Sequence, residues 1–152
     1  MRRATTADLP AIVGLLADDP LGAIRERAGL PLDGRYLEAF AGIDADPRQL
    51  LMVVTLAGNI VGCMQLSFIP GLSRLGSQRA LIEGVRVAAA LRGRGIGEDM
   101  ILWAKGEALR RHCRILQLTT DRSRQDAHRF YERLGFAASH IGMKLDLDAS
   151  QD

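Results

Sequence analysis

The segment with the clearest potential for chemistry is Arg92-Gly93-Arg94-Gly95-Ile96-Gly97, which is dense in arginine and glycine. It follows an apolar, strand-like stretch and precedes a run with helical spacing. Glycine lets the backbone bend tightly and approach a ligand closely, because it has no Cβ. The first turn of a helix presents unpaired N–H groups and a dipole that favours negative charge, and Arg92 and Arg94 add two permanent cations. The segment therefore predicts a binding site for a phosphate-bearing ligand.

This glycine loop does not match two common phosphate-binding motifs. A Walker loop requires a lysine and then Ser or Thr after the glycines, and no lysine follows them here. A dinucleotide fingerprint requires Gly-x-Gly-x-x-Gly, whereas Gly93 and Gly95 are followed by Gly97, and Glu98 holds the next position. A plain structural turn stays open from the loop alone, because short glycine motifs match by chance.

Two blocks of sequence carry a family resemblance. Residues 92–97 resemble the Arg/Gln-x-x-Gly-x-Gly/Ala pyrophosphate loop of the GNAT superfamily of acyl-CoA-dependent N-acetyltransferases. Residues 127–136, Ala-His-Arg-Phe-Tyr-Glu-Arg-Leu-Gly-Phe, resemble the late helix and following strand of that family. The blocks occur in the family's order and at its usual separation, within about residues 79–147. The resemblance implies acetyl-CoA as co-substrate, no metal, and direct attack by a primary amine in a ternary complex.

The resemblance also implies which residues bind the co-substrate. Main-chain groups of Val85 and Val87 are expected to bond the pantetheine arm. The full set expected to bind acetyl-CoA comprises Val85, Arg86, Val87, Arg92, Gly93, Arg94, Gly95, Ile96, Gly97 and Tyr131. Arg124 stands where the family often has an Asn near the pantetheine, so either Asp121 substitutes for that contact or the contact is absent.

Tyr131 is the first candidate for catalysis. Ala127, Phe130, Tyr131 and Leu134 follow i, i+3, i+4, i+7 spacing, which places Tyr131 on the buried stripe of a helix. A packed core tyrosine with a hydrogen-bonded hydroxyl is the alternative that the residues alone leave open. In GNAT enzymes the matching tyrosine protonates the departing CoA thiolate, so the resemblance implies that Tyr131 is the general acid.

Glu83 is the second candidate, because it interrupts an otherwise apolar strand-like segment over residues 80–87. Burial would raise the pKa of its carboxyl towards neutrality, which suits a base. Several GNAT enzymes place a Glu at this point and use it through water, so the resemblance implies a general base. The alternative is an ion pair with an arginine such as Arg86. The neighbouring Gly84 predicts a bulge, where the family's strand splays.

Composition bounds the class of protein. With 152 residues, 47% hydrophobic and 25% charged, we expect a single domain over residues 1–152. A net charge of +2 is too small to argue for nucleic acid by itself. Cys63 and Cys113 show no zinc spacing, the three histidines are scattered, and two reduced thiols favour a cytoplasmic protein. The N-terminus lacks the apolar stretch of a signal peptide, and no apolar run approaches the roughly 20 residues of a membrane span.

Hydrophobic periodicity and turn residues predict alternating helices and strands. The expected helices lie at about 6–18, 21–44 in two pieces, 95–112 and 125–134. The expected strands lie at about 1–5, 50–56, 60–69, 79–89 and 114–120, with one or two more in 136–147. This is a mixed α/β (α+β) class. The resemblance specifies a GNAT-like domain, whose mixed, mostly antiparallel sheet of six or seven strands splays in the middle and is flanked by about four helices.

The acceptor cannot be identified from the sequence beyond an amine of a small molecule or peptide. Acidic side chains at residues 18–46, where the family usually builds its acceptor wall, would suit a cationic amine. We expect no nucleic-acid or membrane partner, and a homodimer is a state that the family commonly adopts. Two other classes stay open: a non-catalytic acyl-CoA-binding regulatory module, and a nucleic-acid- or protein-binding module that uses the basic side chains.

Overall fold

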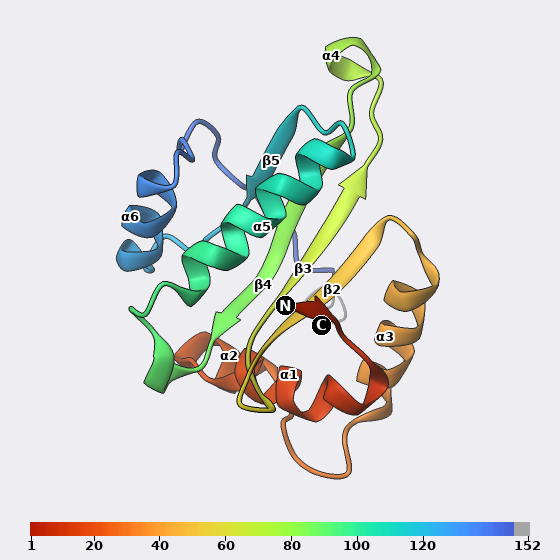
Figure 1. Ribbon diagram of the computed structural model, residues 1–152, viewed down its shortest axis with the longest axis vertical. Coiled ribbons are helices and arrows are strands. Elements are labelled where there is room, and N and C mark those ends of the chain that lie inside the picture. Colours follow the sequence, from red (N-terminus) through yellow and green to blue (C-terminus); the bar gives the residue numbers. More distant parts are fainter. Residues whose placement is uncertain (148–152) are drawn as a thin grey trace. The chain divides into compact units, whose positions relative to one another are not determined.

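A five-stranded sheet organises residues 1–118 of the computed structural model, which describes residues 1–147 of the chain (Figure 1). The strand order is β1-β2-β3-β4-β5, and all neighbours are antiparallel except β4 and β5, which are parallel. The strands are β1 (Arg2–Arg3), β2 (Gln49–Leu56), β3 (Asn59–Ile69), β4 (Arg79–Val87) and β5 (Ile115–Leu118). The mixed α/β class predicted from the sequence is therefore confirmed.

Six α-helices occur within residues 1–147, and four of them have nine residues or more, which agrees with the prediction of about four. They are α1 (Leu9–Ala17), α2 (Pro20–Arg25), α3 (Gly34–Ala45), α4 (Ser73–Gly76), α5 (Ile96–Arg110) and α6 (Gln125–Arg133). Two 3₁₀ turns precede α1 and α5: η1 (Thr6–Asp8) and η2 (Ala89–Leu91). In the part that the structure describes, no helix is both long and apolar enough to cross a bilayer.

The two faces of the sheet are covered by different helices, because successive side chains of a strand point to opposite sides. Val53 and Cys63 belong to a core cluster with residues of α1 and with Phe40 of α3. The alternate face is covered by α5: the Sδ atom of Met100 lies 3.2 Å from the position that a Cβ on Gly62 would occupy. A Cβ at this position would also lie 3.1 Å from Arg86 O, so glycine lets β3, β4 and the Met100 side chain of α5 pack closely there.

The chain divides into two compact units, Met1–Leu118 and Thr119–Asp152. The single domain expected over residues 1–152 stays a prediction. In the second unit α6 ends at Arg133 with Leu134 as its C-cap, and Gly135 follows as expected with a φ of 89°, the left-handed conformation that favours glycine after a helix.

The expectation of one or two final strands in 136–147 is wrong for the described chain. No residue from 134 to 147 forms a strand, so the sheet has five strands rather than six or seven. The alternation of Ile141, Met143, Leu145 and Leu147 with polar residues gives the segment the pattern of a strand. A strand also needs a neighbour for its backbone hydrogen bonds, and the segment has none within residues 1–147.

Asp8 ties the start of the chain to the first helical turn. Its carboxylate accepts hydrogen bonds from Arg2 Nη1 at 2.6 Å and Nη2 at 2.8 Å, and from the Thr5 N–H at 2.7 Å and Oγ1 at 2.9 Å. The Asp8 side chain is only 8% exposed. The Arg2 guanidinium, and then the Thr5 donors, hold the pKa of the Asp8 carboxyl well below its usual range, although burial opposes them.

We expect Asp8→Asn to lower the free energy of unfolding at pH 7 by roughly 1–2 kcal/mol, since Arg2 is half exposed and solvent weakens the pair. Because the folded pKa lies below the unfolded value of about 3.9, this contribution is complete above about pH 4 and is lost as the pH falls towards the folded pKa. Urea denaturation should therefore show the two proteins converging between about pH 4 and pH 2. A stability difference that does not change with pH would contradict this assignment of the charge pair.

Candidate functional site

The centre of β4 contains the bulge that Gly84 predicts. Gln65 of β3 faces Glu83, and Cys63 faces Arg86, so β4 has one more residue than β3 between these two pairs. Gly84 has a φ of 60°, a value that a residue with a Cβ adopts only with strain. The prediction of a bulge in this strand is therefore confirmed.

On the other side of β4, the pairing with β5 covers only the first half of the strand. The parallel ladder to β5 runs from Arg79↔Ile115 to Ile82↔Leu118 and ends there, whereas β4 continues to Val87. Residues 83–87 thus have no β5 neighbour, and their backbone groups on that side lie outside any ladder within the described chain. Val85 O and Val87 O in this stretch accept hydrogen bonds from the side chains of Arg86 and Arg92, and the other backbone groups on that side are available to bond an extended ligand.

The 3₁₀ turn η2 follows β4, and the glycine loop follows η2. Gly93 and Gly95 have φ values of 76° and 84°, and Gly95 is the N-cap of α5. Because α5 begins at Ile96, its first N–H groups have no partner inside the helix. The predicted strand–turn–helix arrangement is present, and the helix bounds differ from those expected by two residues or fewer.

The side chain of Arg92 is held by hydrogen bonds to other residues of the first unit. Its Nε donates to Val87 O at 3.0 Å, and its Nη2 donates to Asp18 O at 2.9 Å and Asp18 Oδ2 at 3.2 Å. The N–H of Ala89 also donates to Asp18 Oδ2, at 3.2 Å. Nη1 of Arg92 makes no hydrogen bond to the residues that the structure describes, so two of its donors are left for a ligand.

Arg94 differs from Arg92 although both stand in the same loop. Its side chain is exposed and has neither a hydrogen bond nor an ion pair within residues 1–147. The loop therefore presents one fixed guanidinium and one that is free to reach an anion.

A second aspartate–arginine contact holds the bulged strand. Arg86 Nε lies 3.2 Å from Asp19 Oδ2, and Arg86 Nη1 donates to Val85 O at 2.9 Å. Asp19 Oδ1 also accepts from the N–H groups of Leu21 and Gly22, which caps α2. The consecutive residues Asp18 and Asp19 thus join the α1–α2 turn to both parts of the candidate site. Sequence reasoning missed this role, because nothing in the local pattern marks the arginine partners.

Glu83 lies in β4 as expected, but its side chain is exposed, so the expected burial of its carboxylate is wrong. The end of the β4–β5 ladder accounts for this result, because β4 has no β5 neighbour from Glu83 onwards. The alternative ion pair with Arg86 is not formed either, since Arg86 pairs with Asp19. The role of Glu83 as a base stays a prediction.

Tyr131 lies on α6, within the second unit. Its ring packs edge to face with Phe130, at 5.1 Å between centroids, and with Phe136, at 5.7 Å. The side chain is half-buried rather than fully buried, and so are the other members of the predicted stripe. Aromatic packing fixes the ring, and its role as general acid stays a prediction.

Two further kinds of chemistry have little support within residues 1–147. No group of three or more His, Cys, Asp or Glu side chains is placed there to hold a metal ion. Burial raises the pKa of the Cys63 thiol to about 12, although nearby Arg86 opposes the shift. Cys63 therefore stays protonated and is a poor nucleophile.

The acidic residues of the expected acceptor wall are mostly paired. Asp18 and Asp19 contact Arg92 and Arg86, as described above. The remaining pairs are Glu26 with the Tyr36 hydroxyl at 2.7 Å, Asp33 with Arg35 at 2.6 Å, Asp44 with Arg3 at 3.8 Å, and Asp46 with Arg48 at 3.1 Å. Arginine partners offset much of the negative charge in this region, which weakens the argument for a cationic acceptor.

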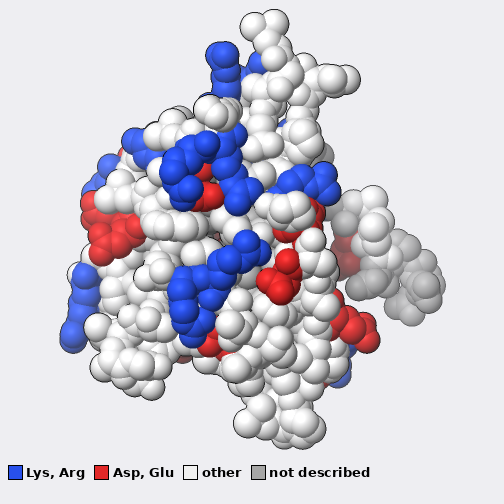
Figure 2. All heavy atoms as spheres, turned by 45° about the vertical axis from the view of Figure 1, so that its right-hand side comes forward, with Lys and Arg blue, Asp and Glu red and all other residues white. Residues whose placement is uncertain are grey.

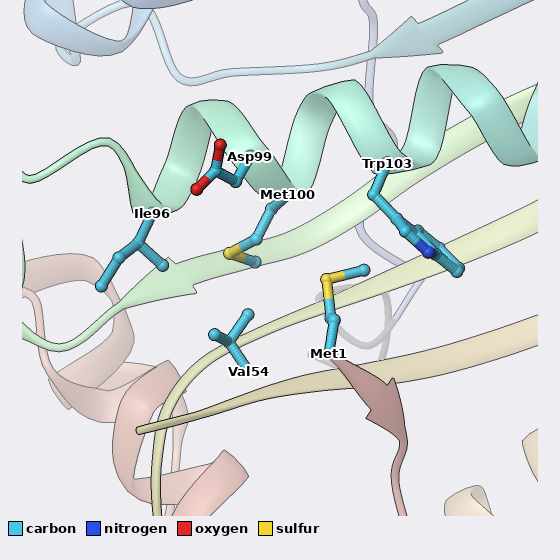
Figure 3. A pocket seen from close by; sticks show the side chains of 6 residues that line it. All are labelled: Met1, Val54, Ile96, Asp99, Met100 and Trp103. Carbon is cyan, nitrogen blue, oxygen red and sulfur yellow. The ribbon is translucent and has the colours of Figure 1, made fainter. Parts of the chain in front are cut away.

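An apolar pocket of about 300 Å³ lies on the α5 side of the sheet (Figure 3). Its only charged lining residue is Asp99, in the first turn of α5. The lining residues are Met1, Val54, Ile96, Asp99, Met100 and Trp103. It shares Ile96 with the glycine loop, whereas the core cluster around Cys63 lies on the opposite face.

Basic side chains do not form one continuous field on the face shown in Figure 2, where acidic side chains lie among them. At the end of α5, Arg110 and Arg111 both pair with the buried Glu107, and Arg111 Nε lies 2.7 Å from its Oε1. These two arginines are therefore engaged in internal contacts rather than gathered for a polyanion.

Comparisons with known proteins agree with this architecture. A curated relative, aminoalkylphosphonate N-acetyltransferase of Salmonella typhimurium, is 27% identical over 144 residues, which cover 93% of this chain and 86% of that protein. A crystal structure from Bacillus halodurans, described as a transcriptional regulator, is 49% identical with a TM-score of 0.93, covering 95% of this chain and 97% of its own. A putative acetyltransferase from Agrobacterium tumefaciens is 29% identical with a TM-score of 0.76, covering 95% of this chain and 97% of its own.

The family model described as acetyltransferase (GNAT) family matches residues 16–136, which include the α1–α2 turn, the bulged strand, the glycine loop and α6. The match covers well over half of the 152 residues. This protein therefore belongs to the GNAT family of acetyltransferases.

Proposed function

We propose that this protein transfers an acetyl group from acetyl-CoA to a primary amine of a small molecule or peptide, by direct attack in a ternary complex. The amine nitrogen attacks the thioester carbonyl carbon, and the carbon–sulfur bond breaks. Glu83 accepts the proton of the amine through water, and Tyr131 donates a proton to the departing thiolate. Holding amine and thioester in line supplies much of the acceleration.

The observation that carries this proposal is the stretch of β4 beyond Ile82, beside the glycine loop, that has no β5 neighbour. The diphosphate of acetyl-CoA would bond the N–H groups at the start of α5, Nη1 of Arg92 and the side chain of Arg94. The pantetheine arm would run along residues 85–87, where β4 lacks a neighbour. A free N–H at this point would also polarise the thioester carbonyl, as an oxyanion donor does.

A screen of amines with acetyl-CoA, in which the release of free thiol is recorded, would identify the acceptor. The Salmonella typhimurium relative makes aminoalkylphosphonates the first compounds to test. We expect thiol release that depends on both the amine and the protein, with one mole of acetylated amine formed per mole of thiol. Thiol release without any acetylated amine across the screen would contradict the proposal.

Glu83→Gln is expected to lower kcat by about 100-fold near neutral pH, because the ammonium form of the acceptor would lose its proton acceptor. The loss should shrink as the pH rises, since the amine then deprotonates in solution. The KM for acetyl-CoA should stay unchanged. The measurement is a pH–rate profile of both proteins, and parallel profiles would remove Glu83 from the mechanism.

A second candidate is a non-catalytic acyl-CoA-binding regulatory module, favoured only by the description of the Bacillus halodurans structure as a transcriptional regulator. Such a module would bind coenzyme A without turning over any amine in the screen. For either function we propose a cytoplasmic location, since Cys63 and Cys113 are buried free thiols.

A further inference from the structure

Two polar side chains lie opposite each other on the face of the sheet that α1 and α3 cover. Gln65 of β3 lies two positions after Cys63, which belongs to the core cluster on this face, so both side chains point to the same side. Glu83 of β4 is the register partner of Gln65, and partners in an antiparallel pair project their side chains to the same face. The amide of Gln65 and the carboxylate of Glu83 are therefore neighbours, with Cβ atoms about 4.5–5.5 Å apart.

The apolar cluster on this face of the sheet ends beside these two residues. Leu16 Cδ2 of α1 lies 3.7 Å from the position that a Cβ on Gly84 would occupy, and Leu51 of β2 is the other register partner of Gln65. Both leucines are partly buried residues that pack against the cluster, whereas Gln65 is half-buried and Glu83 is exposed. Gln65 and Glu83 thus lie at the margin of the core, where water reaches their side chains.

Two hydrogen bonds fix the orientation of the Gln65 amide. Its Nε2 donates to Gln49 Oε1 at 3.1 Å, and the hydroxyl of the buried Ser67 donates to the same oxygen at 2.7 Å. Gln49 is anchored by Ser67 in this way, and it turns the NH₂ group of Gln65 towards β2. Gln65 Oε1 and the carboxylate of Glu83 make no hydrogen bond or ion pair to any residue from 1 to 147. Two neighbouring strands thus present two acceptors whose hydrogen-bonding capacity is unused.

Two acceptors at this separation suit one bridging water molecule. A water that donates one O–H to each acceptor keeps both lone pairs, and a lone pair accepts the N–H of an incoming ammonium group. When this water takes the proton of the ammonium, it gives one of its own protons to the Glu83 carboxylate, so the water is restored. A carboxamide does not ionise in this pH range, so Gln65 holds the water and takes no proton.

We propose that Gln65 is a positioning residue for the deprotonation of the acceptor amine, because its Oε1 holds the water through which Glu83 acts. This role rests on the proposed function, in which Glu83 accepts that proton. Gln49 and Ser67 contribute one step further away, since they keep the amide of Gln65 in the orientation that directs Oε1 to the water.

Gln65→Met keeps the length of the side chain and removes the acceptor oxygen. With acetyl-CoA and the amine that reacts fastest in the screen, this variant should have a kcat about 10-fold below the wild type near neutral pH, since one hydrogen bond to the water is lost. The KM for acetyl-CoA should stay unchanged. The loss of kcat should shrink as the pH rises, because an amine that deprotonates in solution needs no proton acceptor on the protein. A purely structural effect would lower kcat by the same factor at every pH.

The double variant Glu83→Gln with Gln65→Met tests whether Gln65 acts through Glu83. If it does, the double variant should be no slower than Glu83→Gln alone, whereas independent contributions would multiply to about 1,000-fold. The matched control is Gln78→Met, at another half-buried glutamine, whose Nε2 donates to Arg111 O at 3.3 Å away from Glu83. It should keep kcat within about twofold of the wild type.

Three results would overturn the role of Gln65: wild-type kcat in Gln65→Met at every pH, a loss that does not change with pH, or losses that multiply in the double variant. Gln65→Leu, which also lacks an acceptor, replaces Gln65→Met if circular dichroism shows that the methionine variant does not fold. Any of these results in a wild type that acetylates the amine leaves the acetyltransferase proposal intact. A wild type that acetylates no amine in the screen would refute the proposed function, and the role of Gln65 with it.

Discussion

Replacing Tyr131 by phenylalanine is expected to lower kcat by about 10²–10⁴-fold while the affinity for coenzyme A stays within about twofold of the wild type. The substitution keeps the ring that packs against Phe130 and Phe136, so α6 should retain its structure. Only the hydroxyl is lost, and with it the proton that the thiolate would receive. The measurements are steady-state thiol release at saturating acceptor and calorimetric titration with coenzyme A.

The chain has one other tyrosine, which provides a matched control. The Tyr36 hydroxyl donates to Glu26 Oε2 at 2.7 Å and accepts from the Arg27 N–H at 3.0 Å, so it already has partners within the first unit. Tyr36→Phe should therefore keep kcat within about twofold at saturating acceptor. If Tyr131→Phe retains full turnover, the general acid is another group or water.

Reversing the charge of both loop arginines, Arg92→Glu with Arg94→Glu, is expected to weaken coenzyme A binding by about 100-fold or more. A hydrogen bond to a charged group contributes about 1.5–3 kcal/mol. Because both side chains are exposed, we take the lower value for each of two bonds, about 3 kcal/mol in all, which corresponds to about 100-fold in affinity. Calorimetric titration at one fixed salt concentration measures it, because phosphate contacts weaken as salt rises.

The single variants should separate the two arginines. Arg94→Ala should weaken binding without changing the melting temperature, since Arg94 has no partner within residues 1–147. Arg92→Ala should weaken binding and also lower the melting temperature, because it leaves Asp18 and Val87 O without their contacts. Arg48→Glu with Arg74→Glu carries the same change in net charge away from the loop and should bind coenzyme A normally. Unchanged binding by the double loop variant would refute the diphosphate site.

Local sequence determined much of the candidate site. The left-handed turns at Gly93 and Gly95, the start of α5 and the bulge at Gly84 follow from glycine placement and helical periodicity, which act over a few residues. The two sequence blocks predicted the family, and the match of the family model over residues 16–136 confirms it. The turns, the helix start and the bulge depend on backbone preferences of a few residues, so they can be predicted from the sequence without knowledge of distant contacts.

Only the tertiary structure decided which charged groups meet. Asp18 and Arg92 are 74 positions apart, and no period in the sequence would pair them. The exposure of Glu83 depends on where the β4–β5 ladder stops. The alternation in 141–147 specifies a strand face but cannot specify its partner, since the hydrogen bonds of a strand are made to another segment. Side-chain pairing and strand pairing are long-range contacts, so they are fixed by the folded arrangement rather than by local pattern.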